Sequence, residues 1–354
     1  MTTPESVCVM RLSAVGDICH TLPVIRTLAA AWPDTRITWV IGRLEATLIG
    51  DIPGIEFIIF DKSQGRKAHR QLRRQLAGRH FDLLLHMQVS LRASIATLNI
   101  RARRRLGFDH RRARDFQWLF TNEKIAARVR EHVMDGLFGF TDALGIRERV
   151  LRWDIPLSDA DRTFAAEQIP AGTPTLIISP LANPRLRNWR NWSIERYAAV
   201  ADYAEMKHGL RVILTGGPSA AEREVGRVIG DLCHTRPIDL IGKTTLKQLV
   251  ALLQRATALV SPDSGPAHMG TAVGTPVIGL YATTNVERSG PYLHREWVVN
   301  RYPEALRRFA GTTPEEARWG MRVRHPEAMQ LIQVADVTAM LDRVLKERGN
   351  RSES

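Results

Sequence analysis

The stretch that decides the fold is VCVMRLSAVGDICHTLP, residues 7–23. Val7–Leu12 is an apolar run of strand length, and Leu22–Trp32 has the apolar spacing of a helix. The loop between them is Ser-Ala-Val-Gly-Asp, which ends in a single carboxylate, Asp17. A strand, a glycine-containing loop and a helix begin a β-α-β unit, so we expect a parallel sheet.

Asp17 has two interpretations, a helix cap or a group that takes part in chemistry. Aspartate is a preferred residue at helix N-termini. A helix that began directly after Asp17 would contain Pro23 in its second turn, where the missing N–H costs a hydrogen bond. Thr21 is the alternative cap, with Leu22 and Pro23 as the first helical residues, and this arrangement leaves Asp17 in the loop.

Strand-length apolar runs alternate with helix-period segments in both halves of the chain, which predicts parallel sheets covered on both faces. In the first half we expect strands at Val7–Leu12, Arg36–Ile41, Glu56–Phe60, Phe81–His86 and Arg104–Gly107, with helices at Leu22–Trp32 and Lys67–Leu76. In the second half we expect strands at Thr175–Ser179, Arg211–Thr215, Asp239–Gly242, Ala258–Val260 and Val277–Leu280, with helices at Ser193–Lys207, Ala220–Cys233, Thr245–Arg255 and Ala267–Val273.

The chain has 354 residues, more than one hydrophobic core usually contains. The polar, Pro- and Gly-containing stretch 158–174 separates the two β-α blocks. We therefore expect an α/β protein with two Rossmann-like domains, residues 1–160 and 161–354, the second ending in a helix near Val334–Glu347. Ligands of doubly wound sheets bind at the carboxyl ends of the strands, so the site is expected in a cleft between the domains.

The positive charge is concentrated in one segment. The chain has a net charge of +13, and Lys62 to Arg130 contains eighteen Lys/Arg but only four Asp/Glu. Such a field favours an anionic partner, either nucleic acid, an anionic membrane surface or a phosphorylated substrate, unless it is a solvated arginine-rich helix face. Aromatic residues are not interleaved with these arginines and no nucleic-acid module is present, so we expect no nucleic-acid partner.

The remaining composition predicts a cytoplasmic protein without a metal or another cofactor. Cys8, Cys19 and Cys233 have neither metal-type spacing nor an even number, which fits a reducing compartment. No apolar run approaches the ~20 residues of a membrane span. The first predicted strand begins too early to leave room for a signal peptide. The eleven histidines are scattered without an H-x-x-x-H pair.

The most informative loop is VSPDSGPAHMGTAVGTP, residues 260–276. A strand ends at Val260, the turn Asp263-Ser264-Gly265 follows, and a helix begins near Pro266. The free N–H groups of that helix and the Ser264 hydroxyl would form an anion site suited to a pyrophosphate. The alternative is a simple Asp or Ser cap, with His268 satisfied in the first turn.

Two further loops follow predicted strands. The first contains Gly216 and Gly217 in ILTGGPSAAERE, residues 213–224. These glycines could contact a nucleotide or form a tight turn. NPRLRNWRNWSIERY, residues 183–197, contains an arginine that could clamp a phosphate, or a cation–π cluster at the hinge. Neither G-x-G-x-x-G nor the P-loop pattern occurs. The motifs that would indicate a common dehydrogenase or a P-loop ATPase are therefore absent from the sequence.

Four segments together resemble glycosyltransferase family 9, the lipopolysaccharide heptosyltransferases. RLSAVGDICHTLP, RNWSIERY, TGGPSAAER and DSGPAHMGTAVGTPVIGLY occur in the family's order and spacing, from Val7 through about Tyr292. The resemblance implies a GT-B fold and an inverting transfer without an obligatory metal. It further implies an ADP-heptose donor and the inner core of lipopolysaccharide as acceptor, with Kdo or heptose on lipid A, at the cytoplasmic face of the inner membrane.

The resemblance also assigns roles to individual residues. The family's general base falls on Asp17, and its diphosphate-binding turn falls on Asp263, Ser264 and Gly265, followed by His268. The donor-phosphate lysine of the family's K-x-W-P-x-E stretch falls on Arg190, with Ser193 in place of Pro, although Arg187 has a similar local context. Glu222 takes the place of a glutamate near the donor ribose. The basic first domain would bind the acceptor, with Arg66, Arg70 and Arg104 as candidate contacts.

The expected mechanism is a single in-line displacement. Asp17 would accept the proton of the attacking hydroxyl, while Arg190 and the helix N-terminus at Ser264–Gly265 would stabilise the departing diphosphate. Three alternatives remain open: transfer from another nucleotide sugar, a nucleotide-sugar epimerase on the same scaffold, and a non-catalytic binding protein for nucleotide sugars or nucleic acid.

Overall fold

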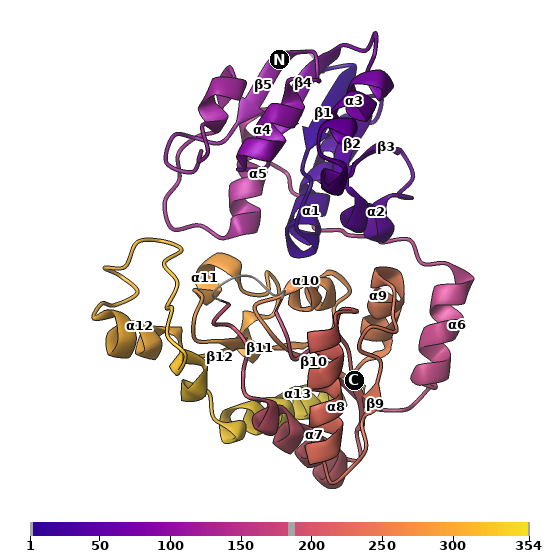
Figure 1. Cartoon of the computed structure of the whole chain (residues 1–354), viewed down its shortest axis with the longest axis vertical. Coiled ribbons are helices and arrows are strands. Elements are labelled where there is room, and N and C mark those ends of the chain that lie inside the picture. Colours follow the sequence, from indigo (N-terminus) through magenta and orange to yellow (C-terminus); the bar gives the residue numbers. More distant parts are fainter. Residues whose placement is uncertain (1–2, 183–187, 353–354) are drawn as a thin grey trace. The chain divides into compact units, whose positions relative to one another are not determined.

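The computed structural model describes residues 3–182 and 188–352 and divides the chain into two compact units, Met1–Pro156 and Leu157–Ser354 (Figure 1). The division lies four residues before the boundary expected from the sequence. We describe each unit by itself.

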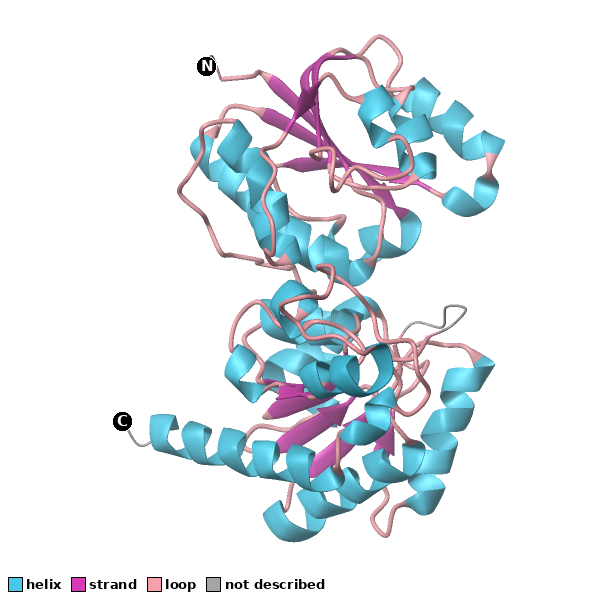
Figure 2. Cartoon of the chain, turned by 90° about the vertical axis from the view of Figure 1, so that its left-hand side faces the viewer, coloured by secondary structure: helices cyan, strands magenta, loops and turns pink. Residues whose placement is uncertain are grey.

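Unit 1 is a parallel six-stranded sheet in the order β3-β2-β1-β4-β5-β6, with helices on both of its faces (Figure 2). Its central strands are almost fully buried, whereas the outer strands β3 and β5 contain exposed and half-buried residues as well as buried ones. The strands are β1 (Ser6–Met10), β2 (Arg36–Gly42), β3 (Ile55–Phe60), β4 (Phe81–His86), β5 (Ala102–Gly107) and β6 (Glu123–Lys124). The helices are α1 (Val15–Ala31), α2 (Arg43–Ile49), η1 (Lys62–Gln64), α3 (Arg66–Gln75), α4 (Leu91–Thr97), η2 (Gln117–Phe120) and α5 (Val133–Ala143).

Unit 2 is a second parallel sheet in the order β12-β11-β10-β7-β8-β9. Counted from the first strand of each unit, both sheets have the Rossmann order 3-2-1-4-5-6. The strands are β7 (Thr175–Ile178), β8 (Arg211–Leu214), β9 (Ile238–Asp239), β10 (Ala258–Pro262), β11 (Val277–Tyr281) and β12 (Val299–Asn300). The helices are α6 (Asp159–Gln168), α7 (Ile194–His208), α8 (Ala220–Leu232), α9 (Leu246–Arg255), α10 (Gly265–Ala272), α11 (Val286–Ser289), η3 (Arg295–Trp297), α12 (Tyr302–Ala310), η4 (Ala328–Leu331) and α13 (Val334–Ser352).

The start of α1 differs from the sequence prediction. The helix begins at Val15, so the expectation that it starts at Leu22 after a Thr21 cap is wrong, and Pro23 lies inside it. Proline lacks the N–H that would bond to the carbonyl four residues earlier, that of Cys19. The indole N–H of Trp153 donates to this Cys19 oxygen at 2.7 Å instead. A tertiary contact therefore replaces the helical bond, and the helix continues through Pro23.

The polar stretch expected to separate the domains, residues 158–174, lies entirely in unit 2. Ser158 caps α6, and the Asp161 carboxylate accepts the Ser158 N–H in return at 3.0 Å. Helix α6 packs against α9, and the C-terminal helix α13 packs against α7 of the same unit. Within the described ranges, no helix combines the length and the apolar character needed to cross a membrane.

Candidate functional site

The loop 11–14, together with Asp17 in the helical turn that follows it, is called the Asp17 loop; it leaves the carboxyl end of β1, where the strand order of unit 1 reverses between β1 and β4. Asp17 lies in the first turn of α1, and its Oδ2 accepts the backbone N–H of Ala14 at 3.0 Å. The same oxygen contacts the Arg11 guanidinium at 2.9 Å. The side chain remains 39% exposed, and Oδ1 has no hydrogen-bond partner among the described residues. One carboxylate oxygen is thus anchored and the other is open.

Arg11 and Gln88 hold this loop in place. Arg11 is 8% exposed and also donates to the carbonyl oxygen of Met87. The Oε1 of Gln88 accepts the N–H groups of Leu12 and Ser13 at 2.6 and 3.2 Å. These contacts join the end of β1 to the residues that follow β4, so the Asp17 carboxylate is presented by a braced loop.

Glu45 places a second carboxyl group beside the same loop. It lies in the first turn of α2, and a Cβ at Gly42 would collide with its carboxylate and with the carbonyl oxygen of Leu12. Burial raises the pKa of Glu45, while a hydrogen bond to its own backbone N–H and the charges of Lys62 and Arg11 oppose the rise. Gly42 is therefore required for the close approach of these groups.

In unit 2, the turn after β10 exposes the N-terminus of α10. Ser264 is the N-cap residue, but its side chain makes no capping bond to α10 and instead bonds to the Ser261 hydroxyl at 2.8 Å. Pro266 occupies the first helical turn. The backbone N–H groups at the start of α10 are consequently not occupied by the cap side chain, which is the arrangement that binds a phosphate.

Arg190 adds positive charge to this turn, and His268 lies beside it. The Arg190 guanidinium donates to the carbonyl oxygen of Asp263 at 2.7 Å and to the Asn188 side chain at 3.1 Å. The Nε2 of His268 lies 3.8 Å from the Asp263 carboxylate. Burial by itself would raise the pKa of Asp263, but a hydrogen bond from His268 and the charges of His268 and Arg190 hold it below its usual value. The Asp263 carboxylate is thus held by contacts with His268 and with the Ser289 hydroxyl.

The glycine loop after β8 is closed by a carboxylate. The Gly217 N–H donates to Glu222, which lies in the first turn of α8. A Cβ at Gly217 would lie 2.8 and 2.9 Å from the two Glu222 oxygens, and one at Gly216 would lie 3.2 Å from the nearer oxygen. The structure therefore brings Gly216, Gly217 and Glu222 together, and any side chain at Gly217 would displace the carboxylate.

The three candidate acceptor arginines differ in their surroundings. Arg66 and Arg70 are exposed on α3. This helix follows the carboxyl end of β3, and the Asp17 loop follows the carboxyl end of β1 in the same parallel sheet. Arg104 lies in the middle of β5 and forms a two-pronged ion pair with Glu123 at 2.7 and 2.8 Å. Arg187 lies outside the described residues.

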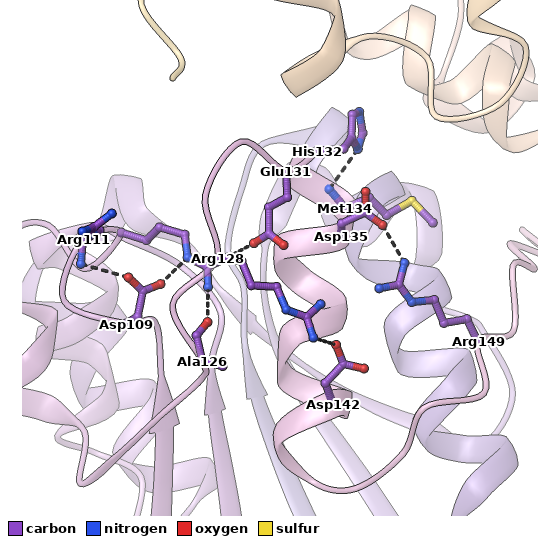
Figure 3. A network of polar contacts seen from close by, with 11 residues as sticks. Asp109, Arg111, Ala126, Arg128, Glu131, His132, Met134, Asp135, Asp142 and Arg149 are labelled. Carbon is purple, nitrogen blue, oxygen red and sulfur yellow. Dashed lines mark hydrogen bonds and ion pairs between the residues drawn. The ribbon is translucent and has the colours of Figure 1, made fainter. Parts of the chain in front are cut away.

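Several of the other arginines of unit 1 form ion pairs with carboxylates of the same unit. Figure 3 shows ion pairs between Arg128 and Asp142, 2.9 Å apart, and between Arg149 and Asp135, 2.5 Å apart. Arg112 bonds to both Asp109 and Glu131. The basic field predicted from the sequence is thus partly structural, and only its unpaired members are candidates for an external anion.

Sequence reasoning missed Arg11, Gln88, Glu45 and Asn188. Arg11 is the first residue after β1 and Gln88 the second after β4, and these two strands are neighbours in the sheet, a signal that the strand order would have revealed. In the described ranges, no three His, Cys, Asp or Glu side chains are grouped to hold a metal ion.

Comparisons with known proteins show the family of the chain. The family model "Glycosyltransferase family 9 (heptosyltransferase)" matches residues 69–317. The chain is 39% identical to the lipopolysaccharide core heptosyltransferase OpsX of Haemophilus influenzae, over 96% of this chain and 97% of that protein.

Two solved structures show the same fold. A family 9 glycosyltransferase of Veillonella parvula is 23% identical, covers 97% of both chains and has a TM-score of 0.78. The Escherichia coli heptosyltransferase WaaC with ADP is 18% identical, covers 96% of this chain and 99% of that one, and has a TM-score of 0.73. The fold is therefore of the GT-B type, as the sequence predicted. From its sequence, its fold and its site together, the chain is a glycosyltransferase that belongs to family 9, the heptosyltransferases.

Proposed function

We propose that the chain moves heptose from ADP-heptose to a Kdo or heptose residue of the lipopolysaccharide inner core, with inversion at the anomeric carbon. The name of the Haemophilus influenzae relative, a lipopolysaccharide core heptosyltransferase, supports this substrate class. The solved WaaC structure contains ADP, which supports an ADP-sugar as donor.

The observation that carries the proposal is the half-anchored carboxylate of Asp17. An inverting transfer needs a base that takes the proton of the attacking hydroxyl as its oxygen bonds to the anomeric carbon. Asp17 Oδ2 is held by Arg11 and by the N–H of Ala14, while Oδ1 is open to receive that proton. Because the carboxylate is already oriented, little reorganisation is required when the hydroxyl arrives.

The turn after β10 would stabilise the negative charge that develops on the departing ADP. The bond from the anomeric carbon to the diphosphate breaks, and the electron pair remains on the phosphate oxygen. The N-terminus of α10 and the Arg190 guanidinium are fixed donors for that charge. Gly216, Gly217 and Glu222 are assigned to the nucleoside, with the glutamate near the ribose. In this proposal residues 161–354 bind the donor, and both substrates must be present for transfer.

The acceptor is assigned to unit 1. Arg66 and Arg70 are exposed cations on the helix that follows the carboxyl end of β3, in the same sheet whose strand β1 leads to Asp17. They suit the carboxylates and phosphates of an inner-core sugar. Arg104 would contribute less, because Glu123 already neutralises it. Since the acceptor is a lipid, the enzyme would work as a peripheral protein at the cytoplasmic face of the inner membrane.

Asp17→Asn tests the base. Asparagine keeps an oxygen that can accept the Ala14 N–H, but it cannot take up the proton. We expect turnover to fall at least about 10²-fold while donor binding is retained. Asp161→Asn is a matched control, because Asp161 accepts the N–H of its own cap residue in the same way. Asp17→Asn with wild-type turnover would refute the role, as would equal losses in both variants.

The donor is tested separately. We expect ADP-heptose to raise the Tm of the full chain more than UDP- or GDP-sugars do, and to be consumed when a truncated lipopolysaccharide core is added. Stabilisation and turnover with a different nucleotide sugar would replace heptose in the proposal and leave the role of Asp17 intact.

A further inference from the structure

Half of the exposed large apolar side chains of the described residues are contributed by two neighbouring elements of unit 1. Three lie on α4 and at its C-terminal end, at i, i+4 and i+7, so they share one helix face. Three lie on or next to η2. We call this set the α4–η2 face, and it consists of Leu91, Ile95, Leu98, Phe116, Trp118 and Leu119.

Arg105 connects the two elements of this face. Its guanidinium donates to the carbonyl oxygens of Thr97 and Ile100, at the end of α4, at 3.0 and 2.9 Å. The same group donates to the carbonyl oxygen of Phe120 at the end of η2, at 2.8 Å. Helix α4 packs directly against η2. The two sets of apolar side chains are therefore neighbours in space.

The η2 segment is built to point its large side chains outward. Gln117 is fully buried, and its amide donates to the carbonyl oxygens of His86 and Gln88 at 2.8 and 3.2 Å. Its neighbours Phe116 and Trp118 are 61% and 47% exposed. Phe116 has a left-handed backbone with φ of 59°, a conformation that residues with a Cβ rarely adopt. Their exposure is thus imposed by a buried anchor and is not a consequence of a loose loop.

Five exposed arginines lie in the stretch 92–114, which contains most of α4, β5 and the loop that leads to η2. None of the five has an ion-pair partner among the described residues, in contrast to Arg104, Arg112 and Arg128, which are paired. In Figure 3 the Arg111 side chain extends away from the network around Asp109. The exposed set is Arg92, Arg101, Arg103, Arg111 and Arg114.

We propose that the α4–η2 face docks the enzyme on an anionic lipid bilayer. Aromatic and leucine side chains enter the boundary between head groups and acyl chains, while arginines bind the lipid phosphates. The inference rests on the proposed function, since the proposed acceptor is itself embedded in a membrane. The charge argues for a bilayer over a second copy of the chain, because a two-fold contact would place these arginines against themselves.

The docking face is also connected to the Asp17 loop. Gln117 donates to the carbonyl oxygen of Gln88, and the side chain of Gln88 accepts the N–H groups of Leu12 and Ser13. The membrane-facing segment and the loop that carries the base therefore form one hydrogen-bonded body. Docking at this face fixes the orientation of the Asp17 loop relative to the lipid surface.

Sedimentation with vesicles tests the proposal on the full chain. We expect binding to vesicles of phosphatidylglycerol and phosphatidylcholine, and at least about tenfold weaker partition of a Trp118→Ser/Leu119→Ser variant. The matched control is Met206→Ser/Leu232→Ser, which removes two side chains of unit 2 with exposed fractions of 71% and 46%. This control should bind vesicles like the wild type. Equal binding by the wild type and the Trp118/Leu119 variant would overturn the proposal.

Charge and self-association provide two further readouts. Arg111→Gln/Arg114→Gln should weaken binding to the anionic vesicles, and binding should fall as salt shortens the Debye length from about 10 Å toward about 3 Å. Equal binding to pure phosphatidylcholine would contradict the role of charge. A dimer in vesicle-free buffer that the Trp118/Leu119 variant abolishes would assign the face to a second copy instead.

Activity on a delipidated core oligosaccharide separates this inference from the proposed function. The Trp118/Leu119 variant should retain wild-type kcat on the soluble acceptor and lose activity only on acceptor in vesicles. Failure of every variant and of the wild type on the soluble acceptor would refute the proposed function, whereas intact vesicle activity in the Trp118/Leu119 variant would refute the docking face alone.

Discussion

Trp153 allows helix α1 to continue through Pro23, and this claim can be tested quantitatively. Its indole N–H donates to the carbonyl oxygen of Cys19, which Pro23 leaves without a helical partner. Trp153 is 7% exposed, so Trp153→Phe leaves a buried acceptor unsatisfied, at a cost of about 1–3 kcal/mol. The smaller ring also leaves a cavity worth about 1 kcal/mol. We expect a total destabilisation of about 2–4 kcal/mol.

A double-mutant cycle isolates the hydrogen bond. Pro23→Ala restores an N–H that can bond to the Cys19 oxygen within the helix. In that background, Trp153→Phe should cost only the cavity, about 1 kcal/mol, so the coupling energy is about 1–3 kcal/mol. Trp118→Phe is the control, since Trp118 is exposed, and its effect should stay within about 0.5 kcal/mol.

Thermal unfolding and hydrogen exchange measure these changes. For a unit of this size, each 1 kcal/mol shifts Tm by roughly 2–4 °C, so Trp153→Phe alone should lower the Tm of unit 1 by about 4–16 °C. Hydrogen exchange should accelerate at the α1 amides around Cys19 in this variant and recover when Pro23→Ala is added. If Trp153→Phe costs the same in both backgrounds, the indole does not replace the missing helical bond.

Three further outcomes follow from the site. Burial, with the charges of Arg105 and Arg11, lowers the pKa of His86 to about 3. Below pH ~6.5 the unfolded chain therefore binds a proton that the folded chain does not, and stability should fall by up to ~1.4 kcal/mol per pH unit in urea titrations, a slope that His86→Asn should reduce. Gly217→Ala should weaken donor binding about tenfold by calorimetry, because its Cβ displaces Glu222, while Gly230→Ala, which meets nothing within 4 Å, should not. Arg190→Lys should retain more turnover than Arg190→Ala, which should lose about 10²–10³-fold, and equal losses would show that charge at this position does not matter.

Much of the fold could be predicted from local sequence. The buried strands β1, β2, β4, β7, β8, β10 and β11 are apolar runs, since a strand covered on both faces needs no polar alternation. The turn at Asp263–Gly265 was also recognisable, because proline and glycine mark the start of a helix after a strand. Two edge strands of two residues each, β6 and β12, carry no such pattern and were missed.

The sequence by itself determined two parallel α/β units, the candidate residues at the strand ends and an excess of positive charge. Tertiary structure alone decided which contacts hold those residues. Gln88 bonds to Leu12 across 76 residues of sequence, and Trp153 bonds to Cys19 across 134. The local spacing of apolar residues cannot predict such long-range hydrogen bonds. The tertiary structure also decides which arginines form ion pairs with acidic residues and which remain exposed. The physical reason is that local patterns record burial, whereas hydrogen bonds and ion pairs depend on which strands the fold places side by side.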